Sequence, residues 1–170
     1  MIVNVAFEHF YKLTREKGHF HITLQAIHEK SLAEGTDISL IVDTGAHLTV
    51  LSRRTAILCG FDKLPKKTTF IHGYSGKEPA DLVYIQGLKV LGKVMTNVPV
   101  FIPHAMYSID PDTKEQRQFQ EILGLNVLEY FNYYVCTEED KLYIKWIPTP
   151  RPYDKKLACG EIYTVQSNLT

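Results

Sequence analysis

The stretch from Ile38 to Leu51, read as ISLIVDTGAHLTVL, constrains the fold more than any other part of this chain. Five mostly apolar, strand-favouring residues lead to Asp43, and Thr44 and Gly45 form a tight turn before a second apolar run begins at Leu48. A carboxylate at the end of a buried strand costs free energy unless neighbouring groups bind it or shift its pKa. Gly45 lets the backbone bend without a steric penalty, and Thr44 places a hydroxyl beside the acid. The pattern predicts a strand, turn and strand that hold one acid in place.

The same pattern also has a purely structural interpretation, so its meaning depends on the rest of the chain. An aspartate after a strand often forms an Asx-turn, in which its side chain bonds to the backbone two residues further on. Two other segments favour a functional interpretation. Residues 71–76, read as IHGYSG, place two glycines between strand-like runs and predict the tip of a β-hairpin. Residues 122–128, read as ILGLNVL, place a glycine between two strand-like residues and a short helix.

In this order, the three segments resemble the signatures of the retropepsin-like aspartic proteases. The first signature of that family reads Asp-Thr-Gly-Ala and matches residues 43–46, which are followed by Thr49-Val50-Leu51. The flap hairpin of the family matches residues 71–76, and its second signature matches residues 122–128. The resemblance extends over about residues 20 to 146. It implies a mainly β, closed barrel-like acid-protease (retropepsin) fold with a flap hairpin and two short helices.

The resemblance also implies roles for individual residues. Asp43 would be the catalytic acid, supported by Thr44 and Gly45 within the same turn. The substrate would contact the floor and the flap of a groove, at Ala46, Gly73, Tyr74, Ser75 and Gly76. The implied activity is hydrolysis of peptide bonds in a polypeptide substrate by an activated water molecule, with no metal ion and no organic cofactor.

This activity needs two carboxylates, and each chain supplies one. In aspartic proteases, two acids share a proton, so that one activates a water molecule while the other protonates the carbonyl oxygen of the peptide bond. The sequence contains a single Asp-Thr-Gly or Asp-Ser-Gly motif, at Asp43. We therefore expect a homodimer in which a two-fold axis brings Asp43 of both subunits together.

Two positions differ from the retroviral members of the family. Those members carry an acid soon after the first signature and an arginine after the glycine of the second, and this ion pair stabilises their dimer. The chain has His47 and Leu125 at these positions, so both partners of the pair are replaced together and neither is left as an unpaired buried charge. Another segment is expected to complete the dimer interface, and the candidates are residues 1–18, residues 103–118 and the C-terminal tail.

The composition of the chain argues against several other classes of function. The 170 residues are 45% hydrophobic and 22% charged, which is typical of one globular domain. Nineteen basic and nineteen acidic side chains give a formal net charge of zero, which argues against nucleic acid and membrane as partners. Three cysteines without C-x-x-C spacing, and no run of roughly 20 apolar residues, predict a cytoplasmic protein. His19 and His21 have no third ligand at a spacing that suits a metal site.

The alternative function is a catalytically silent dimer, an adaptor that binds extended peptides in the same groove. The enzyme is favoured because a peptide binder has no need for an acid followed by Thr44 and Gly45. The chain is expected to comprise an N-terminal extension (1–18), a retropepsin-like protease domain (19–147) and a C-terminal tail (148–170).

Local signals predict several further elements. Ser52 is expected to cap a helix over Arg53–Cys59 that stops at Gly60. Pro99 is expected at a sheet edge or a bulge, because proline cannot donate a hydrogen bond to a neighbouring strand. Residues 103–118 are expected to form a long surface connection.

Overall fold

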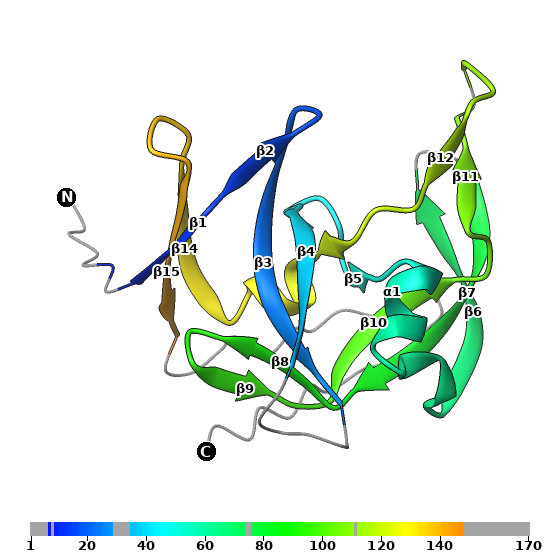
Figure 1. Ribbon diagram of the computed structural model, residues 1–170, viewed down its shortest axis with the longest axis horizontal. Coiled ribbons are helices and arrows are strands. Elements are labelled where there is room, and N and C mark those ends of the chain that lie inside the picture. The colour runs from blue at the N-terminus through cyan, green and yellow to red at the C-terminus, as the bar shows by residue number, and fades with distance from the viewer. Residues whose placement is uncertain (1–6, 8, 29–34, 74–75, 111, 148–170) are drawn as a thin grey trace.

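The computed structural model describes residues 7, 9–28, 35–73, 76–110 and 112–147, which form a mainly β structure (Figure 1). It contains a ten-stranded sheet, a three-stranded sheet and a two-stranded hairpin. The strands of the large sheet are β2 (Thr14–Glu16), β3 (His19–Ile27), β4 (Thr36–Val42), β5 (Thr49–Val50), β6 (Lys66–Gly73), β7 (Gly76–Ile85), β8 (Gly87–Val90), β9 (Lys93–Met95), β10 (Val98–Pro103) and β13 (Ile122–Leu123). The helices are α1 (Arg53–Leu58) and α2 (Leu125–Leu128), with a 3-10 turn at Phe61–Lys63.

The large sheet follows the order β6-β7-β10-β5-β13-β4-β3-β8-β9, with β2 paired to β3. Alternation of side chains along its strands gives it a buried face. In β4, for example, Ile38 and Leu40 are buried whereas Asp37 and Ser39 are exposed. The prediction of a mainly β fold with two short helices is confirmed. The flap hairpin is formed by β6 and β7, which pair in antiparallel register up to Gly73 and Gly76.

Helix α1 begins at Arg53, as the sequence predicts, and ends at Leu58, one residue before the predicted end, with Cys59 as its C-cap. The side chain of Ser52 accepts a hydrogen bond from the backbone N–H of Thr55 and thereby caps the first turn. Gly60 follows the helix with φ of +72°, a left-handed conformation that glycine adopts without strain. No helix among the described residues has the length and apolar character needed to cross a bilayer.

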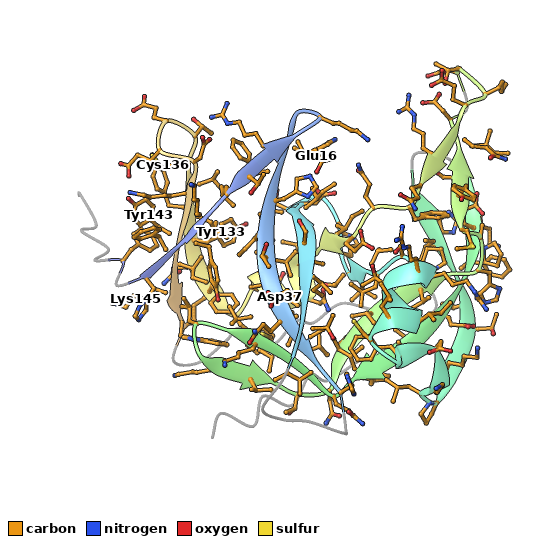
Figure 2. All side chains as sticks on the ribbon, viewed as in Figure 1. Glu16, Asp37, Tyr133, Cys136, Tyr143 and Lys145 are labelled. Carbon is orange, nitrogen blue, oxygen red and sulfur yellow. The ribbon has the colours of Figure 1, made fainter. Side chains whose placement is uncertain are left out.

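The three-stranded sheet joins the two ends of the described chain. It contains β1 (His9–Lys12), β15 (Lys141–Trp146) and β14 (Phe131–Cys136), in that order. Phe10, Tyr143 and Tyr134 stand opposite one another on neighbouring strands, with ring centroids 5.8 and 6.4 Å apart. Figure 2 shows Tyr143 on the outer side of this sheet, whereas Tyr133 projects toward the large sheet and packs against the core.

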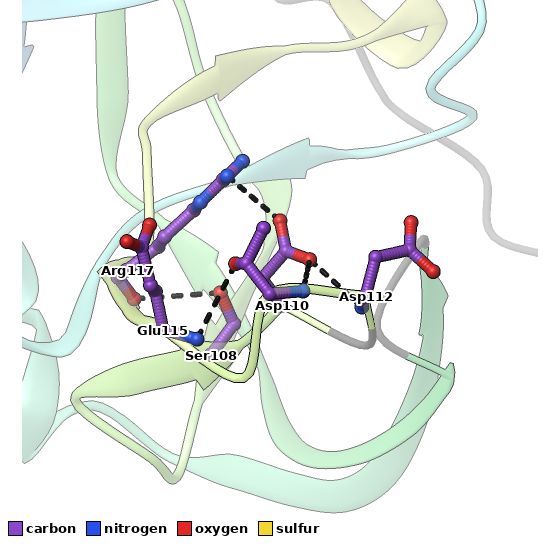
Figure 3. A network of polar contacts seen from close by, with 6 residues as sticks. Ser108, Asp110, Asp112, Glu115 and Arg117 are labelled. Carbon is purple, nitrogen blue, oxygen red and sulfur yellow. Dashed lines mark hydrogen bonds and ion pairs between the residues drawn. The ribbon is translucent and has the colours of Figure 1, made fainter.

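The expected surface connection at residues 103–118 is instead a short β-hairpin, formed by β11 (Tyr107–Ile109) and β12 (Gln116–Gln118). It projects at the opposite end of the large sheet from the three-stranded sheet (Figure 1). Its turn is held by Asp110, whose Oδ1 accepts hydrogen bonds from the backbone N–H groups of Asp112 and Thr113 at 2.9 and 3.0 Å (Figure 3). Oδ2 forms an ion pair with Arg117 at 2.8 Å. Backbone hydrogen bonds from Thr113 and Asp112 keep the pKa of the Asp110 carboxyl below its usual value.

Pro99 does not lie on an edge strand, because β10 has β7 on one side and β5 on the other. Its pairing with Tyr84 is antiparallel, and the parallel pairing to β5 begins one residue later, at Val100. The missing N–H of the proline therefore falls just before the ladder to β5 begins.

Candidate active site

The turn at Asp43 follows directly after β4 and is closed by its own hydrogen bonds. Asp43 Oδ1 accepts a hydrogen bond from the backbone N–H of Gly45 at 2.8 Å, and Ala46 N–H donates to the Asp43 carbonyl at 3.3 Å. The Asx-turn anticipated as a structural interpretation is therefore present. It engages Oδ1, and among the described residues no hydrogen bond is made to Oδ2. The turn therefore holds the carboxylate through one of its two oxygens.

The second signature segment lies directly beneath this turn. Strand β13 lies between β4 and β5 and runs parallel to β4, with Leu123 opposite Val42. The backbone N–H of Asp43 donates to the carbonyl of Leu123 at 3.2 Å. Strand β13 therefore supports the acid-bearing turn from below.

Helix α2 holds the other end of the turn. Its first residue, Leu125, donates its N–H to the carbonyl of Ala46 at 2.9 Å, and Asn126 N–H donates to the carbonyl of His47 at 3.2 Å. A Cβ at Gly124 would lie 2.5 Å from the carbonyl carbon of Leu48, closer than atoms of two residues can approach. Glycine is required at this position because the two segments cross in close contact.

Asn126 connects three parts of the site and was not singled out from the sequence. Its Oδ1 accepts hydrogen bonds from the backbone N–H and the hydroxyl of Thr49, at 2.8 and 2.9 Å. Its Nδ2 donates to the carbonyl of Pro99 at 2.8 Å, and Thr49 Oγ1 accepts from the N–H of Gly124 at 3.2 Å. Asn126 and Thr49 are both buried. The available signal was a single amide side chain in the otherwise apolar run ILGLNVL.

The structure brings the four residues of the first signature together and exposes part of the turn. Asp43 and Ala46 are half-buried, whereas Thr44 and Gly45 are exposed. His47 is exposed and Leu125 is half-buried, so the positions of the retroviral ion pair lie beside the turn without charge complementarity. Of the flap residues, Gly73 and Gly76 face each other at the end of the hairpin, and Tyr74 and Ser75 lie outside the described residues. Among the described residues, no group of three or more His, Cys, Asp or Glu side chains is arranged to hold a metal ion.

Comparison with known proteins agrees with this arrangement. Residues 31–130 match the family model described as "gag-polyprotein putative aspartyl protease". The fold is similar to the crystal structure of a retropepsin-like aspartic protease from Rickettsia conorii, with a TM-score of 0.53 and 20% sequence identity, over 84% of this chain and 96% of that chain. A search of curated proteins found no significant match. At this identity the structural likeness establishes the fold, and the matched family model covers both the acid-bearing turn and Gly124.

Proposed function

The chain belongs to the gag-polyprotein aspartyl protease family, and on that premise we propose that it is an aspartic endopeptidase whose catalytic centre combines Asp43 from each subunit of a homodimer. The main support for the proposal is that hydrogen bonds hold the turn at Asp43 in one position. Its turn is bonded internally at Gly45 and externally to Leu123 and Leu125, two residues of the second signature. A carboxylate fixed at an exposed turn is suited to general acid–base chemistry rather than to structural support alone.

The two carboxyl groups would share one proton, so that one acts as a general base and the other as a general acid. The ionised one removes a proton from a water molecule, whose oxygen attacks the carbonyl carbon of the peptide bond, while the protonated one donates its proton to the carbonyl oxygen. One hydroxyl of the resulting tetrahedral intermediate gives its proton to the carboxylate that had protonated the carbonyl oxygen, the C–N bond breaks, and the leaving nitrogen takes up the proton that the other carboxyl removed from water. Two like charges at short distance cannot both remain ionised, which keeps one proton on the pair.

The dimer is part of this proposal because one subunit offers one such acid. Thr44 and Gly45 are exposed at the end of the turn, where a partner subunit can contact them. We assign Thr44 a hydrogen bond to the partner's equivalent loop, which would keep the two carboxyl groups coplanar. Ala46 would form the floor of the groove and the β6–β7 hairpin would cover an extended polypeptide, contributing backbone hydrogen bonds. We also propose that the chain consists of an N-terminal extension (1–18), a protease domain (19–147) and a C-terminal tail (148–170).

Replacement of Asp43 tests the proposal directly. Wild type and Asp43→Asn are incubated with a peptide library between pH 4 and 7, and cleavage is followed by mass spectrometry. We expect Asp43→Asn to reduce turnover by about a thousandfold, because the amide can neither accept a proton from water nor share one. Asp37→Asn removes an exposed acid from β4, the strand that leads to Asp43, and should retain activity. Equal cleavage by wild type and Asp43→Asn contradicts the proposal, and peptide binding without cleavage by either protein identifies the adaptor instead.

A further inference from the structure

A second polar cluster lies at the base of the flap hairpin, built around Asp81 of β7. The side chain of Asp81 is 7% exposed. Its Oδ1 accepts a hydrogen bond from Thr68 Oγ1 at 3.0 Å and contacts His104 Nε2 at 2.8 Å. Its Oδ2 forms an ion pair with Lys66 Nζ at 3.1 Å. Residues from both flap strands and from the segment after β10 therefore converge on one buried carboxylate.

These contacts keep Asp81 ionised. Burial alone would raise the pKa of its carboxyl, but the hydrogen bonds from His104, Lys66 and Thr68 outweigh this effect and hold the pKa below its usual value. An ionised Asp81 is a fixed anchor for the two nitrogen-bearing side chains. Lys66 and His104 are held in place although 46% and 36% of their side chains are exposed.

The cluster opens into a pocket of about 500 Å³, which is lined by Arg53, Lys66, Thr68, Asp81 and His104. Arg53 is the first residue of α1 and is half-buried. Within the described part of the chain, none of the ion pairs or side-chain hydrogen bonds involves its guanidinium. The donors of Arg53 are available to a bound group, and guanidinium geometry matches the two oxygens of a carboxylate or phosphate.

The balance of charge in the pocket favours an anion. Its lining contains two permanent cations, Arg53 and Lys66, against one carboxylate, Asp81. Both oxygens of Asp81 are already bonded to side chains of the cluster, so its charge is compensated locally. Lys66 uses one of its three N–H donors for Asp81, which leaves the others for a ligand.

We propose that this pocket is an anion-binding site that takes a carboxylate or phosphate group between Arg53 and Lys66, with Asp81 acting as a positioning residue. The site is separate from the turn at Asp43, since none of residues 43–46 lines the pocket. It does not depend on proteolysis. Because Lys66 and Asp81 belong to the two strands of the flap hairpin, a bound anion would also connect that hairpin to α1.

Binding of two small probes to the intact wild-type chain tests the proposal and identifies the source of the anion. One probe is inorganic phosphate, and the other is the blocked tripeptide acetyl-Gly-Glu-Gly-amide, compared with its glutamine counterpart. Binding is measured by calorimetry at low ionic strength, because salt screens such contacts. Variants are Arg53→Gln, Arg53→Lys and the matched control Arg54→Gln, which alters the next, exposed residue of α1 outside the pocket.

We expect saturable binding that Arg53→Gln weakens about tenfold, that Arg53→Lys partly restores and that Arg54→Gln leaves unchanged. Binding of phosphate alone identifies a free phosphate or phosphoryl group as the ligand. Binding of the glutamate peptide but not the glutamine peptide identifies an acidic side chain. Binding of neither probe, or equal weakening by Arg53→Gln and Arg54→Gln, overturns the proposal. Circular dichroism of each variant verifies the fold, and cleavage activity is not needed for any of these readouts.

Discussion

Two residues, Gly124 and Asn126, fix the position of the backbone around Asp43. Gly124 allows two segments to cross where no side chain fits, and Asn126 satisfies three backbone or hydroxyl groups at that crossing. Neither residue forms a hydrogen bond with the carboxylate itself. Both act by fixing the backbone on which Asp43 depends, and a polar group buried among strands is costly once its partners are lost.

Replacement of Asn126 tests this role. Asn126→Ala removes the acceptor for Thr49 and the donor for Pro99, and leaves their buried polar groups unpaired. We expect the free energy of unfolding to fall by about 2 to 4 kcal/mol, measured by urea denaturation. Asn132→Ala changes an exposed asparagine of β14 and should have little effect. Equal stability of the two variants would show that the buried amide is not essential to the crossing.

The ionised state of Asp81 predicts a pH dependence of stability. Because its pKa is lowered in the folded chain, its contribution to stability is complete above the usual aspartate pKa of about 3.9 and is lost as pH falls through the lower, folded pKa. Unfolding free energies of wild type and Asp81→Asn should therefore differ at pH 6 and converge toward pH 3. The measurement is urea denaturation at several pH values.

Glu78→Gln, on the same strand but outside the cluster, controls for the loss of one negative charge. A difference between wild type and Asp81→Asn that is the same at pH 6 and pH 3 would show that its partners do not stabilise the ionised carboxylate.

At the scale of elements, the sequence predicts those parts that have strong local signals. An apolar, strand-favouring run identifies β4, the cap at Ser52 and the turn glycine at Gly60 identify α1, and paired glycines identify the β6–β7 hairpin. The β11–β12 hairpin was missed because β12 reads Gln-Arg-Gln and is exposed along its length, so it has no apolar alternation. The pairing of β1 with β15 was not predictable either, since it joins strands that are far apart in the sequence.

The β11–β12 hairpin should depend on Asp110 rather than on core packing. Asp110→Ala removes the acceptor for two turn N–H groups and the partner of Arg117. We expect amide hydrogen exchange in residues 107–118 to accelerate roughly tenfold, with exchange in the large sheet unchanged. Asp110→Asn, which retains an acceptor oxygen but no charge, should lie between wild type and Asp110→Ala. Glu115→Ala is the acidic control within the hairpin, and an equal acceleration there would contradict a specific role for Asp110.

At the scale of the whole molecule, the large sheet joins the flap hairpin, the strands that flank the acid-bearing turn and β3 in one continuous path. Strands β1 and β2, which lie within the expected extension at residues 1–18, pair with β15 and β3, and Leu13 between them is buried. A truncation of this segment would therefore disturb both sheets. Mixing of intact subunits is the better test of the proposed dimer.

Mixed dimers provide this test. If each active centre needs Asp43 from two subunits, adding an equal amount of Asp43→Asn to wild type and allowing exchange should lower activity per wild-type subunit to about half. Larger excesses should lower it further. The Asp37→Asn variant, added in the same way, should leave activity per active subunit unchanged. Cleavage that is insensitive to added Asp43→Asn would mean that each subunit works alone.

The position of β13 also determines when, during synthesis of the chain, the acid-bearing turn gains its supports. Ile122 and Leu123 insert between β4 and β5, which a ribosome completes some seventy residues earlier. Until that late strand emerges, the two early strands lack their common neighbour, and the loop between them lacks its supports at Leu123 and Leu125. A nascent or prematurely terminated chain thus carries Asp43 without the framework that orients it, so the proposed cleavage activity requires synthesis at least through α2.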